Sequence, residues 1–159
     1  MGVLGIDIGL GGGLALISKS GVIVEPMPIV GKELDVATLV RWIRAHKETI
    51  ELAVMEQVHA FPGSSGSSML KFGRVSGIIE GALTAMEIPF RKVRPAIWCK
   101  ELHMGCEGVE KPKDKSRLVV SRLFPSVDLK ATPRSKSPHE GMMDALLIAE
   151  FGRRSKGLS

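Results

Sequence analysis

The chain has 159 residues, of which 44% are hydrophobic, 18 are glycine, 9 are proline and 2 are cysteine. A chain of this length buries roughly 70% of its unfolded surface around one core, so it needs neither disulfides nor a structural metal to fold. The two cysteines give no disulfide framework, and no apolar run approaches the roughly 18 residues of a membrane span. Composition therefore excludes the disordered, collagen-like, disulfide-rich and membrane-spanning classes.

The positive charge is concentrated in one part of the chain. The formal net charge is +5, but residues 91–136 hold 12 Lys and Arg against 5 Asp and Glu, which leaves a net charge of −2 for the rest. A basic patch binds a polyanion through counterion release, so nucleic acid is the partner that this distribution indicates. A solvated basic surface that maintains solubility explains the same charge equally well.

The first residues give an expectation about the compartment. They lack the basic start followed by an apolar stretch that an export signal requires. We therefore expect a cytoplasmic protein of a bacterial or phage-infected cell, or an organellar protein in a eukaryote, with no membrane partner.

Apolar segments and turn residues alternate along the chain in a way that predicts its elements. The first three strands form a meander, and Asp35 is placed to cap the first helix. Strands are predicted at residues 3–7, 14–17, 22–24, 52–56 and 89–93. Helices are predicted from Asp35 to about His46 and over residues 69–86, 113–124 and 138–151. This order predicts an α/β fold with one domain over residues 1–154 and a short tail at 155–159.

Three glycines recur every four residues in the helix predicted over residues 69–86. Gly73, Gly77 and Gly81 form one smooth stripe on a helix, at a cost of roughly 1 kcal/mol each relative to alanine. Such a stripe suits close packing either against another helix of the same chain or against a second copy in a dimer.

Two acids stand where apolar strands end. Asp7 ends the first strand and is followed by a glycine-rich turn, and Glu56 ends the strand over residues 52–56. If these strands run side by side, the two carboxylates lie at adjacent strand ends, where they repel each other. A divalent cation is the common remedy for such repulsion.

Two further acids lie near the C-terminus. Glu140 and Asp144 are four residues apart and therefore share one helix face, where like charges destabilise a helix unless a cation lies between them. Ser137, Pro138 and Glu140 also fit a capping box, in which Glu140 has a purely structural role. The capping box leaves Asp144 unexplained, because that acid lies within an otherwise apolar helix.

The three acid-bearing segments together resemble a known family. They read Gly5-Ile6-Asp7-Ile8-Gly9, Met55-Glu56-Gln57, and His139-Glu140-Gly141-Met142-Met143-Asp144-Ala145. Their order, spacing and sequence are similar to the active-site blocks of RuvC-type Holliday junction resolvases over nearly the whole chain. The similarity is strongest to phage-encoded and chloroplast-type members, in which the final acids are four residues apart.

The resemblance implies a fold, an activity and a metal site. The implied fold is RNase H-like, with a mixed central sheet flanked by helices. The implied activity is resolution of four-way DNA junctions by a homodimer, through paired symmetric nicks that leave 5′-phosphate and 3′-hydroxyl ends. Two Mg²⁺ ions, for which Mn²⁺ substitutes, are implied at Asp7, Glu56, Glu140 and Asp144. The resemblance does not establish a helicase partner.

The chain departs from many bacterial members at one position of the implied metal site. Those members carry Asp or His three residues before the last acid, where this chain has Gly141. Glu140, or His139 in its place, takes the role of that ligand.

The resemblance also directs attention to candidate DNA contacts. Phe61 lies where relatives place an aromatic wedge, although it also fits a simple loop anchor. Lys92 and Arg94 alternate along a strand and so share a face that is able to line the DNA channel. Lys113, Lys115 and Ser116 open a basic helix, with Asp114 as its expected cap, and are positioned to contact phosphate. Surface solvation accounts for these basic residues equally well.

Three alternatives remain at the level of sequence. Cys99, His103 and Cys106 have zinc-ligand chemistry but lack a strong fourth ligand, so ordinary packing of two reduced cysteines is the competing interpretation. Another RNase H-like nuclease, acting on RNA–DNA hybrid or structured RNA, has the same acid pattern. A non-catalytic junction-binding protein is the third alternative, and the four intact acids argue against it because they repel phosphate.

Overall fold

The computed structural model describes residues 1–57, 63 and 65–156. The strands are β1 (Gly2–Asp7), β2 (Gly13–Ser18), β3 (Gly21–Pro26), β4 (Ile29–Val30), β5 (Glu33–Leu34), β6 (Ile50–Glu56) and β7 (Phe90–Val93). The helices are α1 (Val36–His46), the short 3-10 helix η1 (Lys47–Thr49), α2 (Gly66–Ala85), α3 (Pro95–Leu102), α4 (Pro112–Leu123) and α5 (Glu140–Ser155). None of the helices in these ranges combines the length and the apolar run needed to cross a bilayer.

Five strands form a mixed central sheet in the order β3-β2-β1-β6-β7. β1, β2 and β3 pair antiparallel in a meander, whereas β6 is parallel to both β1 and β7. β4 and β5 form a separate two-stranded hairpin. The parallel pairing brings the C-terminal ends of β1 and β6 to the same edge of the sheet.

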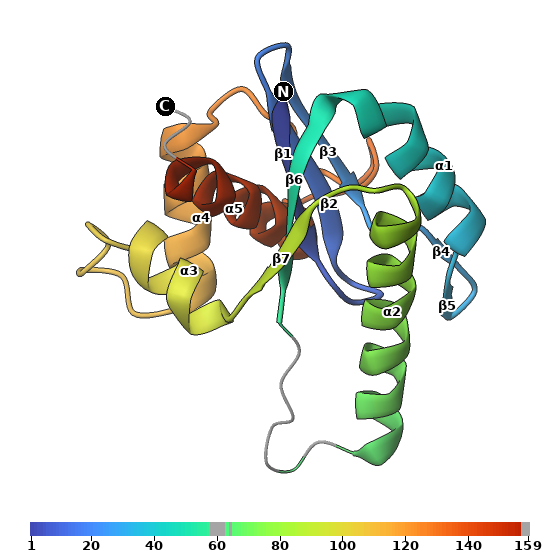
Figure 1. Ribbon diagram of the computed structural model, residues 1–159. Coiled ribbons are helices and arrows are strands. Elements are labelled where there is room, and N and C mark those ends of the chain that lie inside the picture. The colour runs from blue at the N-terminus through green and yellow to red at the C-terminus, as the bar shows by residue number, and fades with distance from the viewer. Residues whose placement is uncertain (58–62, 64, 157–159) are drawn as a thin grey trace.

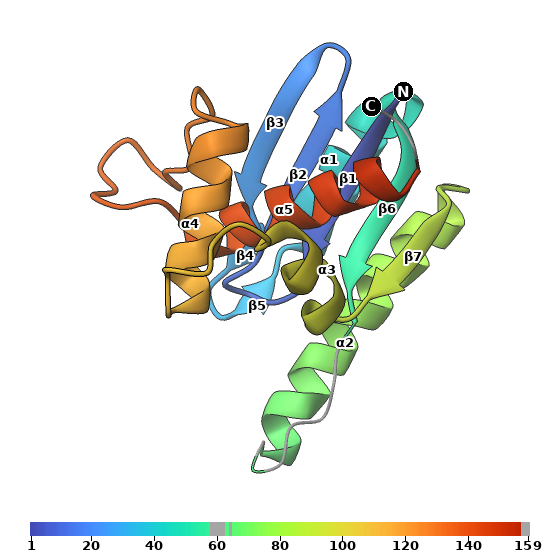
Figure 2. The ribbon, with the colours of Figure 1, turned by 90° about the vertical axis from the view of Figure 1, so that its left-hand side faces the viewer.

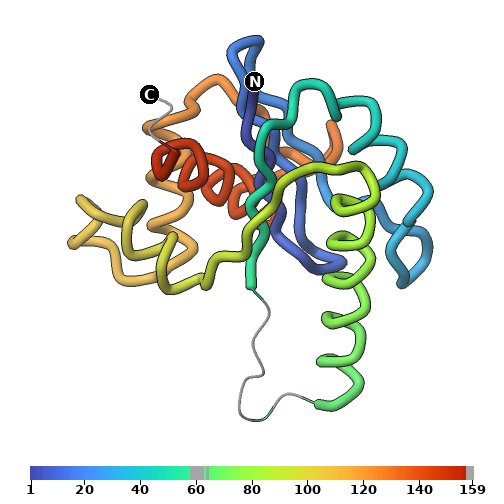
Figure 3. The backbone as a smooth tube through the Cα atoms, viewed as in Figure 1, coloured from blue at the N-terminus to red at the C-terminus, as the bar shows by residue number. Residues whose placement is uncertain are grey.

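Helices cover both faces of the sheet (Figure 1). Side chains alternate between faces along each strand, so Val3 and Val54 pack in the cluster with α5, while Leu4 and Met55 pack in the cluster with α1 and α2. α5 runs across one face with α3 and α4 beside it, and the first half of α2 extends past the end of the sheet (Figure 2). The start of β1 and the end of α5 lie at the opposite end of the molecule (Figure 3).

α5 contacts the sheet with almost no side chain in between. A methyl group at Gly5 would lie 2.1 Å from the carbonyl oxygen of Ala145, and one at Gly141 would lie 2.2 Å from the carbonyl oxygen of Gly11. Real side-chain carbons do not approach backbone atoms so closely, which is why both positions are glycine. The backbone of α5 therefore rests directly on β1 and on the turn before β2.

The expected helix limits need three corrections. α5 begins at Glu140 with His139 as its N-cap, so the predicted capping box with Ser137 is wrong. α4 begins at Pro112 after Lys111, so Asp114 lies within the first turn and does not cap the helix. α2 begins inside the Gly/Ser-rich segment, where the Ser65 side chain accepts a hydrogen bond from the backbone N–H of Ser68.

The sequence did not predict α3 or the β4–β5 hairpin. These elements are short, and their periodicity is too brief to distinguish them from loops. α3 begins at Pro95, which follows β7 directly and occupies the first helical position, where its missing N–H is not needed.

Candidate active site

Asp7 and Glu56 end neighbouring parallel strands. Ile6 pairs with Met55, so the next residue of each strand brings the two acids side by side at the C-terminal edge of the sheet. Asp7 continues the alternation of Val3, and Glu56 that of Val54, so both carboxylates face the side covered by α5. This confirms the juxtaposition of Asp7 and Glu56 that strand order predicts.

α5 supplies the third acid. The contacts that Gly141 and Ala145 make with the sheet hold this part of α5 above β1, and Asp144 precedes Ala145. Asp144 is partly buried in a helix that is otherwise almost wholly buried from Gly141 to Gly152. Asp7, Glu56 and Asp144, together with Glu140 beside them, are called the acid cluster below.

Electrostatics shows that these carboxylates influence one another. Burial and, to a smaller extent, the charges of Glu56 and Asp144 together raise the pKa of Asp7 to about 8. Burial raises the pKa of Asp144 to about 6, with contributions from Glu56 and Glu140 that Lys113 partly opposes. Buried carboxylates that repel one another are costly for stability, and such perturbed acids concentrate at functional sites.

Glu140 lies at the margin of the acid cluster. Its side chain is 51% exposed, and one carboxylate oxygen lies 2.7 Å from the Nζ of Lys113 on α4. The Glu140 carboxylate raises the pKa of Lys113 through this contact. His139, the alternative ligand, instead caps α5, because its Nδ1 accepts a hydrogen bond from the backbone N–H of Met142 at 3.2 Å.

A tryptophan also contacts the acid cluster. Trp98 on α3 is buried, and its indole Nε1 donates a hydrogen bond to Oε1 of Glu56 at 3.3 Å. Cys99, the next residue, is also near the cluster, because Asp144 and Glu56 add to the effect of burial that raises the pKa of its thiol to about 12. No sequence pattern indicates this contact, because α3 itself was not predicted.

Two candidate DNA-binding residues, Lys92 and Arg94, come from the last strand of the sheet and the residue after it. Lys92 projects from the face of the sheet opposite the acids, where its Nζ lies 2.8 Å from a carboxylate oxygen of Glu80 on α2. Arg94 follows β7 directly, at the end of the sheet where the acids lie, and is exposed. Lys92 is therefore paired with Glu80 on the α2 side of the sheet, away from the acids.

The start of α4 places two lysines and a serine differently. Lys113 lies against Glu140, and Lys115 is partly buried. Ser116 is 5% exposed, and its hydroxyl lies 3.1 Å from Nε2 of His103, so its expected availability to phosphate is wrong. Phe61, the candidate wedge, lies outside the described residues.

The donor chemistry of the acid cluster suits a hard divalent cation. Its members are carboxylates, the ligands that Mg²⁺ prefers, and their mutual repulsion at Asp7 is what a cation relieves. Within residues 1–57, 63 and 65–156, no three His, Cys, Asp or Glu side chains converge closely enough to hold a metal as they stand. The same finding applies to Cys99, His103 and Cys106, for which the sequence left a zinc site and ordinary packing of reduced cysteines as alternatives.

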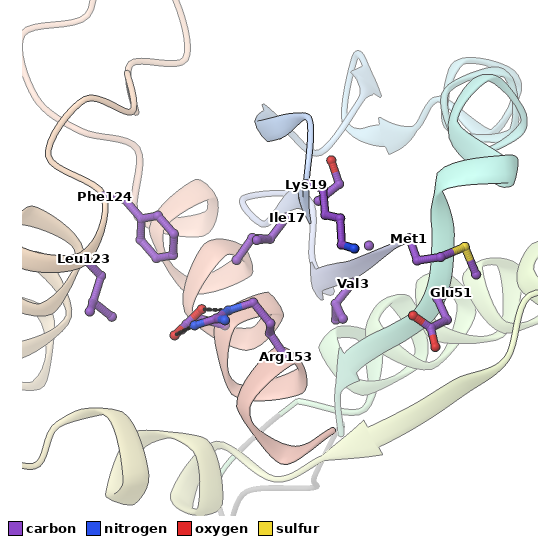
Figure 4. A pocket seen from close by; sticks show the side chains of 11 residues that line it. Met1, Val3, Ile17, Lys19, Glu51, Leu123, Phe124 and Arg153 are labelled. Carbon is purple, nitrogen blue, oxygen red and sulfur yellow. Dashed lines mark hydrogen bonds and ion pairs between the residues drawn. The ribbon is translucent and has the colours of Figure 1, made fainter. Parts of the chain in front are cut away.

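A cavity of about 710 Å³ lies at the other end of β1, away from the acids. Its lining includes Lys19, Phe124 and Arg153 (Figure 4), with the guanidinium of Arg153 held against the buried carboxylate of Glu150. Hydrogen bonds from Arg153 and Arg154 outweigh burial and lower the pKa of Glu150. This cavity is therefore separate from the acid cluster.

Comparison with models of known families finds no match, and neither does comparison with curated protein sequences. Among solved structures, Thermus thermophilus RuvC in complex with a Holliday junction substrate is 18% identical to this chain, with a TM-score of 0.63. The match covers 99% of this chain and 97% of that one. A second Thermus thermophilus RuvC structure is 20% identical, with a TM-score of 0.60, over 98% of this chain and 97% of that one. The chain therefore has the RNase H-like fold in the form found in RuvC, as the motifs around its acids predict.

Proposed function

We propose that the protein is a DNA endonuclease that resolves four-way junctions by paired symmetric nicks with the help of divalent metal ions. The observation that carries this proposal is that Asp7, Glu56 and Asp144, from β1, β6 and α5, lie near enough for their charges to act on one another. The RuvC fold around these acids supports it, because one solved RuvC structure holds a Holliday junction.

In this proposal the acid cluster holds the metal ions. Asp7, Glu56 and Asp144 supply carboxylate oxygens, and Glu140 adds one when it leaves Lys113. Mg²⁺ or Mn²⁺ held there would supply an activated water molecule and charge neutralisation at the scissile phosphate, chemistry that leaves 5′-phosphate and 3′-hydroxyl ends. Burial of Asp7 and Asp144 keeps these carboxylates weakly hydrated, which favours exchange of their protons for a metal.

Basic residues around the acid cluster support DNA as the substrate. Arg94 is exposed between β7 and α3, Lys115 is partly buried in the first turn of α4, and Lys113 reaches Glu140 at the margin of the cluster. These cations attract phosphates and offset the repulsion that the acids exert on them. We assign Arg94, Lys113 and Lys115 to phosphate contacts.

Paired nicks require two active sites, and α2 offers the surface for a homodimer. A methyl group at Gly73, Gly77 or Gly81 would have no heavy atom within 4 Å. The interpretation of this stripe as packing within the chain is therefore wrong, because the stripe faces outward. We propose that the two α2 helices pack against each other in the dimer through this stripe.

The test is a synthetic four-way junction with end-labelled strands, incubated with wild-type protein in Mg²⁺ or in EDTA. Linear duplex of the same sequence and RNA–DNA hybrid serve as competing substrates. Asp144→Asn is the test variant, because it removes one charge from the acid cluster and keeps the side-chain size. Asp128→Asn is the matched control, because Asp128 is exposed and bonds only locally, to the backbone of Lys130.

We expect symmetric nicks in the junction that disappear in EDTA and in Asp144→Asn, and persist in Asp128→Asn. Tight junction binding without any nicking in Mg²⁺ would overturn the proposal in favour of a non-catalytic binding protein. Preferential cutting of the hybrid would retain the acid cluster as a nuclease site and replace the substrate.

A further inference from the structure

We infer that Trp98 is a positioning residue, which fixes the carboxylate of Glu56 in the orientation that metal binding requires. The indole N–H donates to Oε1 of Glu56 at 3.3 Å, from a side chain that is 3% exposed. This inference rests on the proposed function, because it assigns a role toward the metal ions that the acid cluster is proposed to hold.

The chain connects Trp98 to Glu56 through a short, rigid path. Glu56 pairs with Val93 at the end of β7, and the backbone N–H of Gln57 donates to the carbonyl oxygen of Val93 at 2.7 Å. α3 begins two residues after Val93, at Pro95. The same strand pairing that places Glu56 at the sheet edge therefore also sets the start of the helix that carries Trp98.

The ring of Trp98 is held from its other side. The imidazole of His103 meets it edge to face, with ring centroids 6.1 Å apart and an interplanar angle of 75°. Nε2 of His103 in turn lies 3.1 Å from the buried hydroxyl of Ser116 on α4. This arrangement ties α3 to α4 behind the indole, so the indole N–H is held at Glu56 by groups that do not belong to the acid cluster.

A fixed indole changes what Glu56 can do. Its carboxylate lies among Asp7 and Asp144, whose charges repel it. A hydrogen bond to Oε1 retains the carboxylate at the sheet edge against this repulsion and fixes its orientation. Removing a group that orients a metal ligand in this way commonly lowers metal affinity by about 10- to 100-fold.

The experiment compares Trp98→Phe with Trp42→Phe. The first keeps a ring in the core and removes the N–H, whereas the second makes the same change at the other tryptophan of the chain, on α1 across the sheet. Metal binding to the DNA-free protein is measured by calorimetry with Mg²⁺ and Mn²⁺. Junction binding in EDTA, junction cleavage against Mg²⁺ concentration and thermal unfolding are measured in parallel.

We expect Trp98→Phe to weaken Mg²⁺ binding about tenfold and to raise the Mg²⁺ midpoint of cleavage equally. Junction binding in EDTA and the cleavage rate at saturating Mg²⁺ should stay near the wild-type values. Trp42→Phe should leave the metal affinity unchanged. Equal metal affinity in Trp98→Phe and wild type would overturn the inference while leaving the proposed nuclease intact.

A second measurement needs no change at Trp98. In Trp42→Phe, Trp98 is the sole tryptophan, so its fluorescence reports on the indole that contacts Glu56. We expect its emission to change on titration with Mg²⁺, at the midpoint found by calorimetry, and this response to be absent when Glu56→Gln is added. Metal binding without any change in Trp98 emission would contradict the inference, even if Trp98→Phe fails to fold. A wild-type protein that binds no divalent metal would instead refute the proposed function.

Discussion

Asp7→Asn tests whether the acid cluster is electrostatically strained without metal. Burial and the charges of Glu56 and Asp144 raise the pKa of Asp7 from 3.8 to about 8. The folded protein therefore holds this proton more tightly than the unfolded chain does. The stability that results is fully present below pH 3.8 and is lost as the pH rises through about 8.

The magnitude follows from proton linkage. Between the two pKa values each pH unit costs about 1.4 kcal/mol of unfolding free energy, so the loss between pH 6.5 and 8 is about 1.5 kcal/mol. This window isolates Asp7, because Asp144, with a pKa of about 6, is already mostly ionised at its lower limit. Burial, with the charge of Lys115, lowers the pKa of His103, and this contribution is common to wild type and Asp7→Asn, so it cancels from their difference.

The assay is urea unfolding in EDTA at pH 6.5 and pH 8, followed by circular dichroism. Asn cannot ionise, so the stability of Asp7→Asn relative to wild type should increase by about 1.5 kcal/mol across the window. Asp35→Asn is the control, because Asp35 caps α1, hydrogen bonds from Thr38 lower its pKa, and Asn caps a helix equally well. Parallel pH profiles of wild type and Asp7→Asn would refute the electrostatic strain assigned to the acid cluster.

Three further predictions concern metal, packing and assembly. At subsaturating Mg²⁺, junction cleavage should rise with pH through the pKa values of about 6 for Asp144 and about 8 for Asp7. A higher Mg²⁺ concentration should move this pH profile to lower pH, because the metal competes with protons for the carboxylates. A pH profile that does not change with Mg²⁺ concentration would contradict this prediction. Gly141→Ala should destabilise the fold by about 3 kcal/mol in urea unfolding, because the added methyl group meets the backbone at Gly11. The control Gly108→Ala, whose methyl group enters open space, should be nearly neutral. Equal effects of the two substitutions would disprove the close contact of α5. Gly77→Ala should stabilise α2 by about 1 kcal/mol, whereas Gly77→Leu should yield monomers in sedimentation analysis; a dimeric Gly77→Leu would exclude the stripe as the interface.

The sequence by itself determined the elements with long, regular patterns. The apolar strands around Leu4, Leu16 and Val54 and the helices containing Leu39 and Leu146 were predicted because each carries a long apolar pattern that the fold buries. Two acids at strand ends also follow from the sequence, since a carboxylate after an apolar strand must lie at the edge of a sheet. The resemblance of the three acid-bearing segments predicted the RNase H-like fold.

The tertiary structure alone decided how these residues surround one another. Strand pairing placed Glu56 beside Asp7, and contact through Gly5 and Gly141 placed Asp144 over them. It also turned Lys92 away from the acids, buried Ser116 against His103 and brought Trp98 to Glu56. Sequence periodicity reports which face of one element is buried, but contacts between elements depend on register and crossing geometry, which no local pattern records.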